Sequence, residues 1–347
     1  MMTSKAASIG IVENRLPFFL LILINVFVGS MVGLERTVLP LIGEKLFGLA
    51  SASAALSFIV SFGFSKALVN LLAGALADRF GRKKILLMGW VFGLFVPLLI
   101  IFASAWWMVI VANIFLGINQ GLTWSMTVNM KVDLAKPSQR GMAVGLNEFA
   151  GYMGLSVMAA VSGYVASTTS LRPEPFLLGF GIVGLGFLLS LFVPDTSRQV
   201  VRQTASGESS LPFWQAFTQT TWKQPALSSF SFAGLTTNLK DGMAWGLFPL
   251  FFASGGLSVS QIGVLVAAYP LTWGMAQLFT GPWSDVIGRK WLIVGGLWLQ
   301  AFSLWALLAG LFVDTLNVSW AIGLVAVLPF AAGIVTLVRM QESLKKD

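Results

Sequence analysis

Charged and amide side chains inside long apolar segments are the residues of this sequence best suited to chemistry. An ionisable group near the centre of a bilayer is costly, so each is a candidate for binding a substrate or carrying a proton. The candidates for such a substrate or proton pathway are Lys66, Asn113, Asn119, Gln120, Asn147, Glu148, Asn238, Lys240 and Asp241.

Lys66 and Glu148 are predicted at similar depths in two different apolar segments. If they pair, each lowers the desolvation cost of the other, and the carboxylate could exchange a proton for a substrate cation. A fixed ion pair that only ties two helices together fits the sequence equally well.

The segment around Asn238, Lys240 and Asp241 is polar for an apolar stretch, and Asn238 and Asp241 have the spacing that shares one helix face. Together with Gly242 and Pro249, these residues favour an interrupted helix that lines a water-filled cavity. Local bonding between helices is the alternative.

Four further polar residues have two interpretations each. Glu35 and Arg36 are predicted near the outer end of the first apolar segment, where long charged side chains reach water at low cost. They fit a gate or an interface anchor. Asn119 and Gln120 could bind substrate or hydrogen-bond a neighbouring helix.

The composition requires lipid as the main solvent of these segments. Of the 347 residues, 56% are hydrophobic and only 10% are charged. Cysteine and histidine are both absent, which removes disulfides and thiolate or imidazole metal sites. No nucleophile and base can be paired, so the sequence predicts neither an enzyme nor a cofactor.

The apolar segments predict ten membrane-spanning helices, and an even number places both termini on one side. Most Lys and Arg residues, including Arg15, Arg82 and Lys131, fall on that side, which the positive-inside rule identifies as the cytoplasm. The net charge of +8 is therefore a signal of membrane orientation and not of nucleic-acid binding. The predicted spans are 16–37, 53–76, 85–105, 107–130, 142–165, 175–194, 227–253, 259–282, 291–312 and 319–338.

Two loops share the spacing G-x-x-x-D-x-x-G-R-K, and internal symmetry of this kind is how many transporters build a central pathway. Val286 of the second loop stands where the first has Arg79. Gly74 is predicted to allow close packing, and the charges of the loops to hold the cytoplasmic face closed. The residues of the two loops are Gly74, Asp78, Arg79, Gly81, Arg82 and Lys83, and Gly281, Asp285, Gly288, Arg289 and Lys290.

The first loop resembles the signature loop of the major facilitator superfamily (MFS), and the chain resembles its bacterial drug/proton-antiporter members. This resemblance implies an all-α, pseudo-twofold helical bundle. It has an N-terminal six-helix half (1–194), a cytoplasmic linker (195–226) and a shortened C-terminal half of about four helices (227–347). The family has twelve spans, so spans ten and eleven are predicted to be missing, with Leu311 to Asp314 marking the join. A deletion is favoured over a natural short variant.

The resemblance also implies a secondary transporter of the inner membrane that works by alternating access. The leading prediction is proton-coupled export of small amphipathic organic compounds. In much of the family an arginine implicated in proton coupling takes the place of Asn113. Because Lys66 and Lys240 suit an anionic substrate, uptake symport or facilitated transport of an organic anion is an alternative. A non-transporting short product is another, and the oligomeric state is not predicted.

Overall fold

The structure is a computed structural model that describes residues 9–49, 56–197, 212–311 and 316–340, and every regular element in them is helical. Short helices join the long ones: α2 (Leu39–Lys45), η1 (Pro137–Gln139), α10 (Phe213–Thr218) and the π-helix η2 (Gln219–Lys223). The long helices are α1 (Arg15–Arg36), α4 (Ser57–Phe80), α5 (Arg82–Ile101), α6 (Trp106–Leu134), α7 (Arg140–Thr168), α8 (Glu174–Phe192), α11 (Pro225–Ser254), α12 (Val259–Val286), α13 (Lys290–Leu311) and α14 (Leu316–Arg339).

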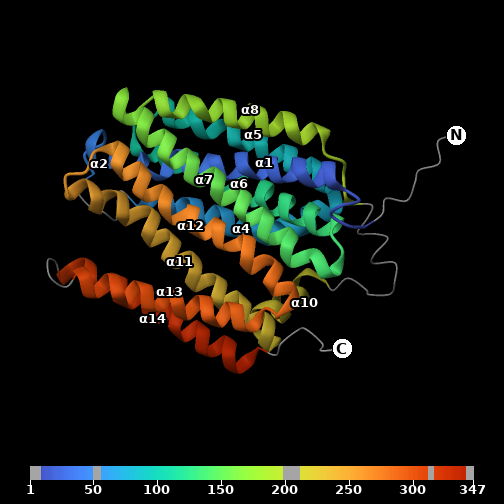
Figure 1. The fold of residues 1–347 in the computed structure, drawn as a ribbon. Helices are drawn as coiled ribbons and strands as arrows, with labels where there is room; N and C mark the ends of the chain where they lie inside the picture. Colours follow the sequence, from blue (N-terminus) through green and yellow to red (C-terminus); the bar gives the residue numbers. More distant parts are fainter. Residues whose placement is uncertain (1–8, 50–55, 198–211, 312–315, 341–347) are drawn as a thin grey trace. The chain divides into compact units, whose positions relative to one another are not determined.

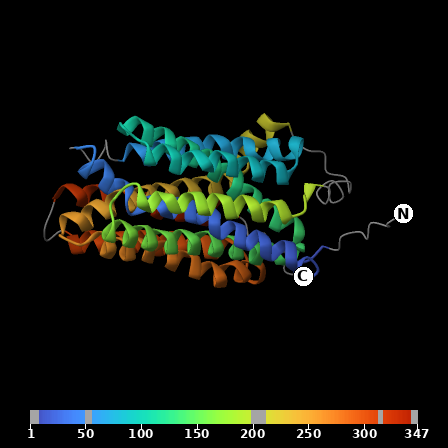
Figure 2. The ribbon, with the colours of Figure 1, turned by 90° about the horizontal axis from the view of Figure 1, so that it is seen from above.

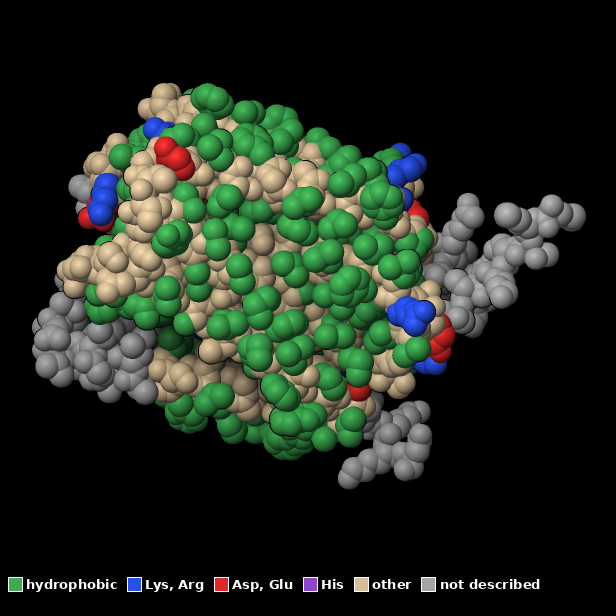
Figure 3. Space-filling view, turned by 45° about the horizontal axis from the view of Figure 1, so that its top comes forward, with side chains coloured by type: hydrophobic (Ala, Val, Ile, Leu, Met, Phe, Trp, Pro, Cys, Tyr) green, Lys and Arg blue, Asp and Glu red, His purple; other side chains and the backbone are tan. Residues whose placement is uncertain are grey.

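Each predicted span coincides with one long helix, so the all-α membrane prediction is confirmed. In the described part of the chain, seven helical segments are long and apolar enough to cross a membrane. The helices α11, α13 and α14 are as long as the others but do not reach that limit in their described residues. On the face shown in Figure 3, charged side chains lie towards the two ends and hydrophobic ones cover the surface between them.

The chain divides into two compact units. The first comprises Met1–Glu208 and Trp245–Pro282, and the second comprises Ser209–Ala244 and Trp283–Asp347. The helix α11 therefore begins in the second unit and ends in the first. The division into halves at 194 and 227 stays a prediction.

Helices α1 and α4–α8 of the first unit run alongside one another (Figures 1 and 2), with α1 against α7 and α6 against both α4 and α5. Small residues set the close approach: a Cβ on Gly29 of α1 would lie 1.8 Å from the Gly151 carbonyl oxygen of α7. A Cβ on Gly117 of α6 would lie 1.9 Å from the Ser65 hydroxyl of α4. Such contacts leave no room for larger residues.

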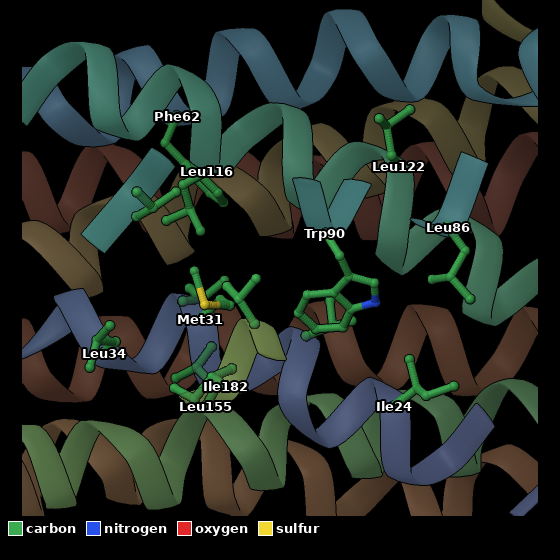
Figure 4. Packing of buried hydrophobic residues seen from close by; sticks show 14 of the residues in the cluster. Ile24, Met31, Leu34, Phe62, Leu86, Trp90, Leu116, Leu122, Leu155 and Ile182 are labelled. Carbon is green, nitrogen blue, oxygen red and sulfur yellow. The ribbon is translucent and has the colours of Figure 1, made fainter. Parts of the chain in front are cut away.

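Apolar side chains from several helices fill the interior of the first unit. Figure 4 shows Phe62 of α4 beside Leu116 of α6, and the fully buried Trp90 of α5. The Trp90 indole N–H donates to the Ser190 hydroxyl of α8 at 3.0 Å. In the second unit, α13 packs on α14, with the Trp298 and Phe330 rings 6.3 Å apart.

Candidate functional site

A buried charged cluster joins α6 to α7 inside the first unit. Lys131 Nζ donates to Asn147 Oδ1 at 2.6 Å, and Asn147 Nδ2 donates to Glu148 Oε1 at 3.1 Å. The Trp124 indole N–H donates to the same Glu148 oxygen at 3.0 Å. We call Lys66, Trp124, Lys131, Asn147 and Glu148 the Lys–Glu cluster.

The structure brings Lys66 of α4 into this cluster. Its Nζ lies 5.4 Å from the ring centre of Trp124 and 5.6 Å from that of Phe62, distances typical of cation–π contacts. Glu148 is attracted electrostatically by both Lys66 and Lys131. The carboxylate therefore has two cations around it rather than the one that the sequence predicted.

Placing Lys131 in a cytoplasmic loop was wrong. The helix α6 continues to Leu134, and the Lys131 side chain is fully buried. Helix continuation past the apolar stretch is possible because Asn147 and Glu148 replace the water that this ammonium loses. The signal was present in the sequence, since Gln120, Trp124, Thr127 and Lys131 recur at helical spacing along one face of α6.

Two residues that the sequence analysis missed hold α1 to this cluster. Asn25 Nδ2 donates to the Asn147 carbonyl oxygen at 2.6 Å, and the Thr127 hydroxyl donates to Asn25 Oδ1 at 2.8 Å. Both side chains are fully buried. These bonds fix the backbone that carries Asn147 and Glu148.

Asn119 and Gln120 take part in helix–helix contacts. Asn119 Nδ2 donates to the Gly89 carbonyl of α5 at 2.8 Å. Gln120 Nε2 donates to the Val28 carbonyl of α1 at 2.9 Å and to Asn119 Oδ1 at 3.0 Å. The structure thus places both in the packing of α6, which is the second of the two interpretations above.

Access of Glu35 and Arg36 to water was also predicted wrongly, because both are fully buried. The Arg36 guanidinium carbon lies 4.7 Å from the ring centre of Phe62, 4.8 Å from that of Trp245 and 5.9 Å from that of Phe58. These aromatic faces replace water around the cation. The hydropathy of the first helix does not reveal these aromatic partners, because they belong to α4 and α11, which are distant in the sequence.

The predicted interruption of the helix around Lys240 is absent, since α11 is continuous from Pro225 to Ser254 and contains Pro249. Proline removes one backbone hydrogen-bond donor from the helix. Membrane helices tolerate this loss because neighbouring groups satisfy the carbonyl that is left free. Lys240 Nζ lies 2.8 Å from Asp241 Oδ1, and both are buried. Asn238 is exposed and donates to the Gly234 carbonyl of its own helix, so it has a different environment from Asp241.

The first signature loop is held by residues that the motif does not include. Arg82 Nε lies 2.7 Å from Asp133 Oδ2, which also accepts from the Thr196 hydroxyl at 2.6 Å. Lys83 Nζ donates to the Leu191 carbonyl at 2.7 Å. Asp78 interacts with Asp133 by repulsion. The loop therefore joins the start of α5 to the ends of α6 and α8.

Asp195 supports the first turn of α5. It accepts hydrogen bonds from the Ser197 hydroxyl and the Ser197 backbone N–H, and the backbone N–H groups of Lys83 and Arg82 also stabilise its charge. The Arg82 N–H itself donates to the Ser197 hydroxyl at 3.0 Å. Partial burial raises the pKa of Asp195, but these hydrogen bonds outweigh it and hold the pKa below its ordinary value. Asp195 is thus a carboxylate that stabilises the N-terminus of α5.

The glycines of the two loops differ in role. Gly81 and Gly288 both have positive φ, +92° and +91°, which explains why both copies place glycine there. Gly281 packs α12 on α7, since a Cβ on it would lie 2.9 Å from Gly145 Cα. The prediction for Gly74 was wrong, because a Cβ on it would meet nothing within 4 Å.

In the described residues, no group of His, Cys, Asp and Glu side chains could hold a metal ion. The Lys–Glu cluster contains no nucleophile activated by a base. What it can do is bind an ion inside an apolar interior and exchange a proton at Glu148.

Comparisons with known proteins identify the family of the chain. The family model of the Major Facilitator Superfamily matches residues 18–239. The "Multidrug resistance protein MdtG" of Enterobacter lignolyticus (strain SCF1) is 28% identical over 88% of this chain and 71% of that relative. The "Hexuronate transporter" of Bacillus subtilis (strain 168) is 26% identical over 94% of this chain and 76% of that relative.

A solved structure shares the fold. The xylose transporter XylE from E. coli, in an inward open conformation, superposes with a TM-score of 0.62 at 18% identity. The match covers 92% of this chain and 80% of XylE. The predicted MFS-type helical membrane fold is thereby confirmed.

Proposed function

Since the chain belongs to the Major Facilitator Superfamily, a family of secondary transporters and not of enzymes, we propose that it carries small organic anions across the membrane together with protons. The Lys–Glu cluster is the proposed site for both ions. The transporter class is shared by the whole family, whereas the substrate and the coupling ion are the proposal.

The charge of the Lys–Glu cluster is the observation that carries the proposal. Lys66 and Lys131 both interact electrostatically with the single carboxylate of Glu148, so the cluster holds an excess of basic over acidic side chains in an apolar interior. Lys131 has no exposed surface, and charges separated from water interact strongly. A carboxylate on a substrate would neutralise that excess.

Proton and anion would bind cooperatively at such a site. A proton on Glu148 removes the charge that competes with the substrate for the two lysines. By linkage, a bound anion then favours protonation of Glu148 to the same extent. Cooperative binding of two ions is the thermodynamic basis of symport, because the doubly loaded and the empty carriers are the favoured forms.

The relatives support two substrate classes. Hexuronate, named for the Bacillus subtilis relative, is a sugar acid with a carboxylate of the kind proposed. The multidrug resistance relative instead supports proton-coupled export of amphipathic compounds. That second candidate has a structural observation in its favour, because Trp124, Tyr152 and Trp273 form a series of ring contacts, each 5.8 Å between centres, next to Glu148.

The two candidates differ in the sign of coupling. A cationic substrate would compete with the proton for Glu148, which produces exchange in opposite directions. An anionic substrate would bind with the proton, which produces movement in the same direction. The excess positive charge favours the anion.

We also propose that both termini face the cytoplasm and that the signature loop closes that side, as the distribution of Lys and Arg suggests. The likeness to drug/proton antiporters in particular, and the missing spans, stay predictions.

Uptake into proteoliposomes tests the substrate class. The panel contains radiolabelled sugar acids, aromatic carboxylates and lipophilic cations, each with an imposed pH gradient. We expect saturable uptake of at least one carboxylate, reduced at least tenfold by Lys131→Met, in which a thioether of similar length replaces the ammonium. The matched control is Lys45→Met at an exposed lysine. Saturable transport of cations alone would overturn the proposal in favour of the second candidate.

A further inference from the structure

We infer that the segment 213–223, which consists of α10 and η2, binds the lipid–water interface of the membrane beside the start of α11. We call Phe213, Trp214, Phe217 and Trp222 of this segment the aromatic anchor. The inference does not depend on the transported substrate, because the segment shares no residue with the Lys–Glu cluster. The sequence analysis treated the segment only as part of the linker 195–226.

Aromatic side chains gather on one side of the segment. The helix η2 follows α10 without a break, and residues four or eight positions apart lie near one another on a helix surface. Phe213 and Phe217 therefore form one row, and Trp214 and Trp222 lie along the adjacent row. The Trp214 ring lies 5.2 Å from that of Phe213 and 5.9 Å from that of Phe217. Three rings thus form one continuous surface, and Trp222 lies further along the same side.

Most of the aromatic anchor is open to its surroundings. Trp214 and Trp222 are each 68% exposed, and Phe213 is exposed as well. Large aromatic rings that are left exposed together mark a surface that binds a partner or a membrane. The anchor therefore needs an apolar neighbour that the described residues do not supply.

The opposite side of the segment is polar and carries no acidic group. Gln215, Gln219 and Lys223 follow one another at four-residue spacing, and 212–227 contains neither Asp nor Glu. Aromatic residues on one side, with amides and a lysine on the other, are typical of a helix that lies in the plane of a membrane interface. The Lys223 ammonium adds attraction to the negatively charged groups of lipids.

A hydrogen bond fixes the level of the segment along α11. The Ser231 hydroxyl of α11 donates to the Thr220 carbonyl oxygen of η2 at 3.3 Å. Ser231 lies about 9 Å along the helix axis from Pro225, the first residue of α11. The segment therefore folds back beside the first turns of α11 (Figure 1). This level fits a helix whose apolar side enters the boundary between lipid headgroups and acyl chains by about 5–10 Å.

Gln224 separates the segment from the spanning helix. It has an extended ψ of 116°, and Pro225 begins α11 directly after it. Because a residue before proline disfavours the helical conformation, the sequence itself produces the change of direction between η2 and α11. The segment can thus lie along the membrane surface while α11 crosses the membrane.

Lipid is the occupant that this surface fits. Tryptophan concentrates at membrane interfaces because its ring is apolar while its N–H donates to headgroups or water. The anchor adjoins a long helix of a chain that is 56% hydrophobic, so lipid surrounds α11 at the level of the anchor. A second protein would have to displace that lipid from both rows of rings.

Spin labels test the inference in the full chain, which contains no cysteine and therefore accepts a single one at any chosen position. The test variant is Thr221→Cys, in the row of Phe213 and Phe217, which keeps all four rings. The control is Gln215→Cys on the polar side. Both are labelled in nanodiscs of phosphatidylcholine and phosphatidylglycerol. Oxygen concentrates in lipid and a nickel chelate stays in water, so we expect an oxygen-to-nickel collision ratio severalfold higher in the test variant.

Two results would overturn the inference. Equal ratios in the two variants, with frequent nickel collisions, would place the whole segment in water. A label in Thr221→Cys that neither reagent reaches would show that protein covers the rings.

Removal of the rings provides a second measurement with the same label. Trp214→Ser with Trp222→Ser should increase the nickel collisions of the Thr221→Cys label severalfold, because the segment leaves the interface. The matched control, Gln215→Ser with Gln219→Ser, changes two residues of the polar side and should leave the collisions unchanged. Unchanged collisions in the tryptophan variant would show that the rings do not hold the segment in lipid.

Discussion

Lys131 Nζ and Asn147 Oδ1 lie 2.6 Å apart, and this contact joins the last turns of α6 to α7 in an interior with no exposed surface at either residue. Asn147 in turn donates to Glu148, so one amide positions both a cation and a carboxylate. Because the Asn147 amide carries no charge, it binds Lys131 without adding a second acidic group to the cluster.

Asn147→Asp should therefore weaken anion binding by charge alone. The new carboxylate is nearly the same shape as the amide, but it neutralises Lys131 and removes the excess positive charge. We expect the apparent affinity for the anion to fall at least tenfold in uptake assays. Asn147→Ala, which removes the bonds without adding a charge, is the control and should fall less. An equal loss in both variants would show that shape and not charge matters.

Lys66 and Glu148 should show strong coupling in a double-mutant cycle. The single substitution Lys66→Gln removes one of the two basic groups that stabilise the Glu148 carboxylate. In the double variant, with Glu148→Gln as well, there is no buried carboxylate left that needs such a partner. We expect the double variant to be more stable in detergent than the sum of the single effects, by about 1–3 kcal/mol in the free energy of unfolding. Additive effects would mean that the two residues do not interact.

Arg82 and Asp133 should tolerate exchange better than removal. Their 2.7 Å contact joins the signature loop to the end of α6. We expect Arg82→Gln and Asp133→Asn each to reduce transport severalfold with normal insertion. The exchange variant Arg82→Asp with Asp133→Arg should recover part of that activity. In the wild type, the Thr196 hydroxyl also donates to Asp133. An arginine at position 133 cannot accept that hydrogen bond, so recovery is not expected to be complete. Normal transport in both single variants would contradict a role for this contact.

Asp195 should stabilise the start of α5 in a pH-dependent way. Because its pKa is lower in the folded protein than its ordinary value of 3.8, its contribution is present above that value. The contribution is lost as the pH falls through the lower, folded-state pKa. We expect hydrogen exchange at the Arg82 and Lys83 amides to be faster in Asp195→Ala than in the wild type near neutral pH. The difference should disappear in acid, and a difference that is constant with pH would contradict this origin.

Sequence patterns predicted those features of the fold that depend on local physics. Apolar length identified all of the long helices, and the repeated motif identified two glycines, Gly81 and Gly288, that share a positive φ. What they did not predict were polar residues whose partners come from distant segments. Lys131 looks like a loop residue until Asn147 is placed beside it, and Arg36 looks accessible until Phe62 and Trp245 cover it.

The partners themselves have no local signature. Asn25, Asp133 and Asp195 are each polar residues near the ends or faces of helices, as many uninvolved residues are. Their roles become visible only when α1, α6 and the segment after α8 are brought together. The candidate site was therefore predictable in its central residues, Lys66 and Glu148, and not in the residues that hold them.

The direction of proton movement driven by an anion gradient tests the central claim most directly. Sealed proteoliposomes that contain a pH-sensitive dye, and no initial pH gradient, receive the transported carboxylate on the outside only. The proposal predicts that the interior becomes acidic as protons enter with the anion, and that Glu148→Gln abolishes the acidification while anion exchange continues. An interior that becomes alkaline would contradict anion–proton symport and establish exchange against protons.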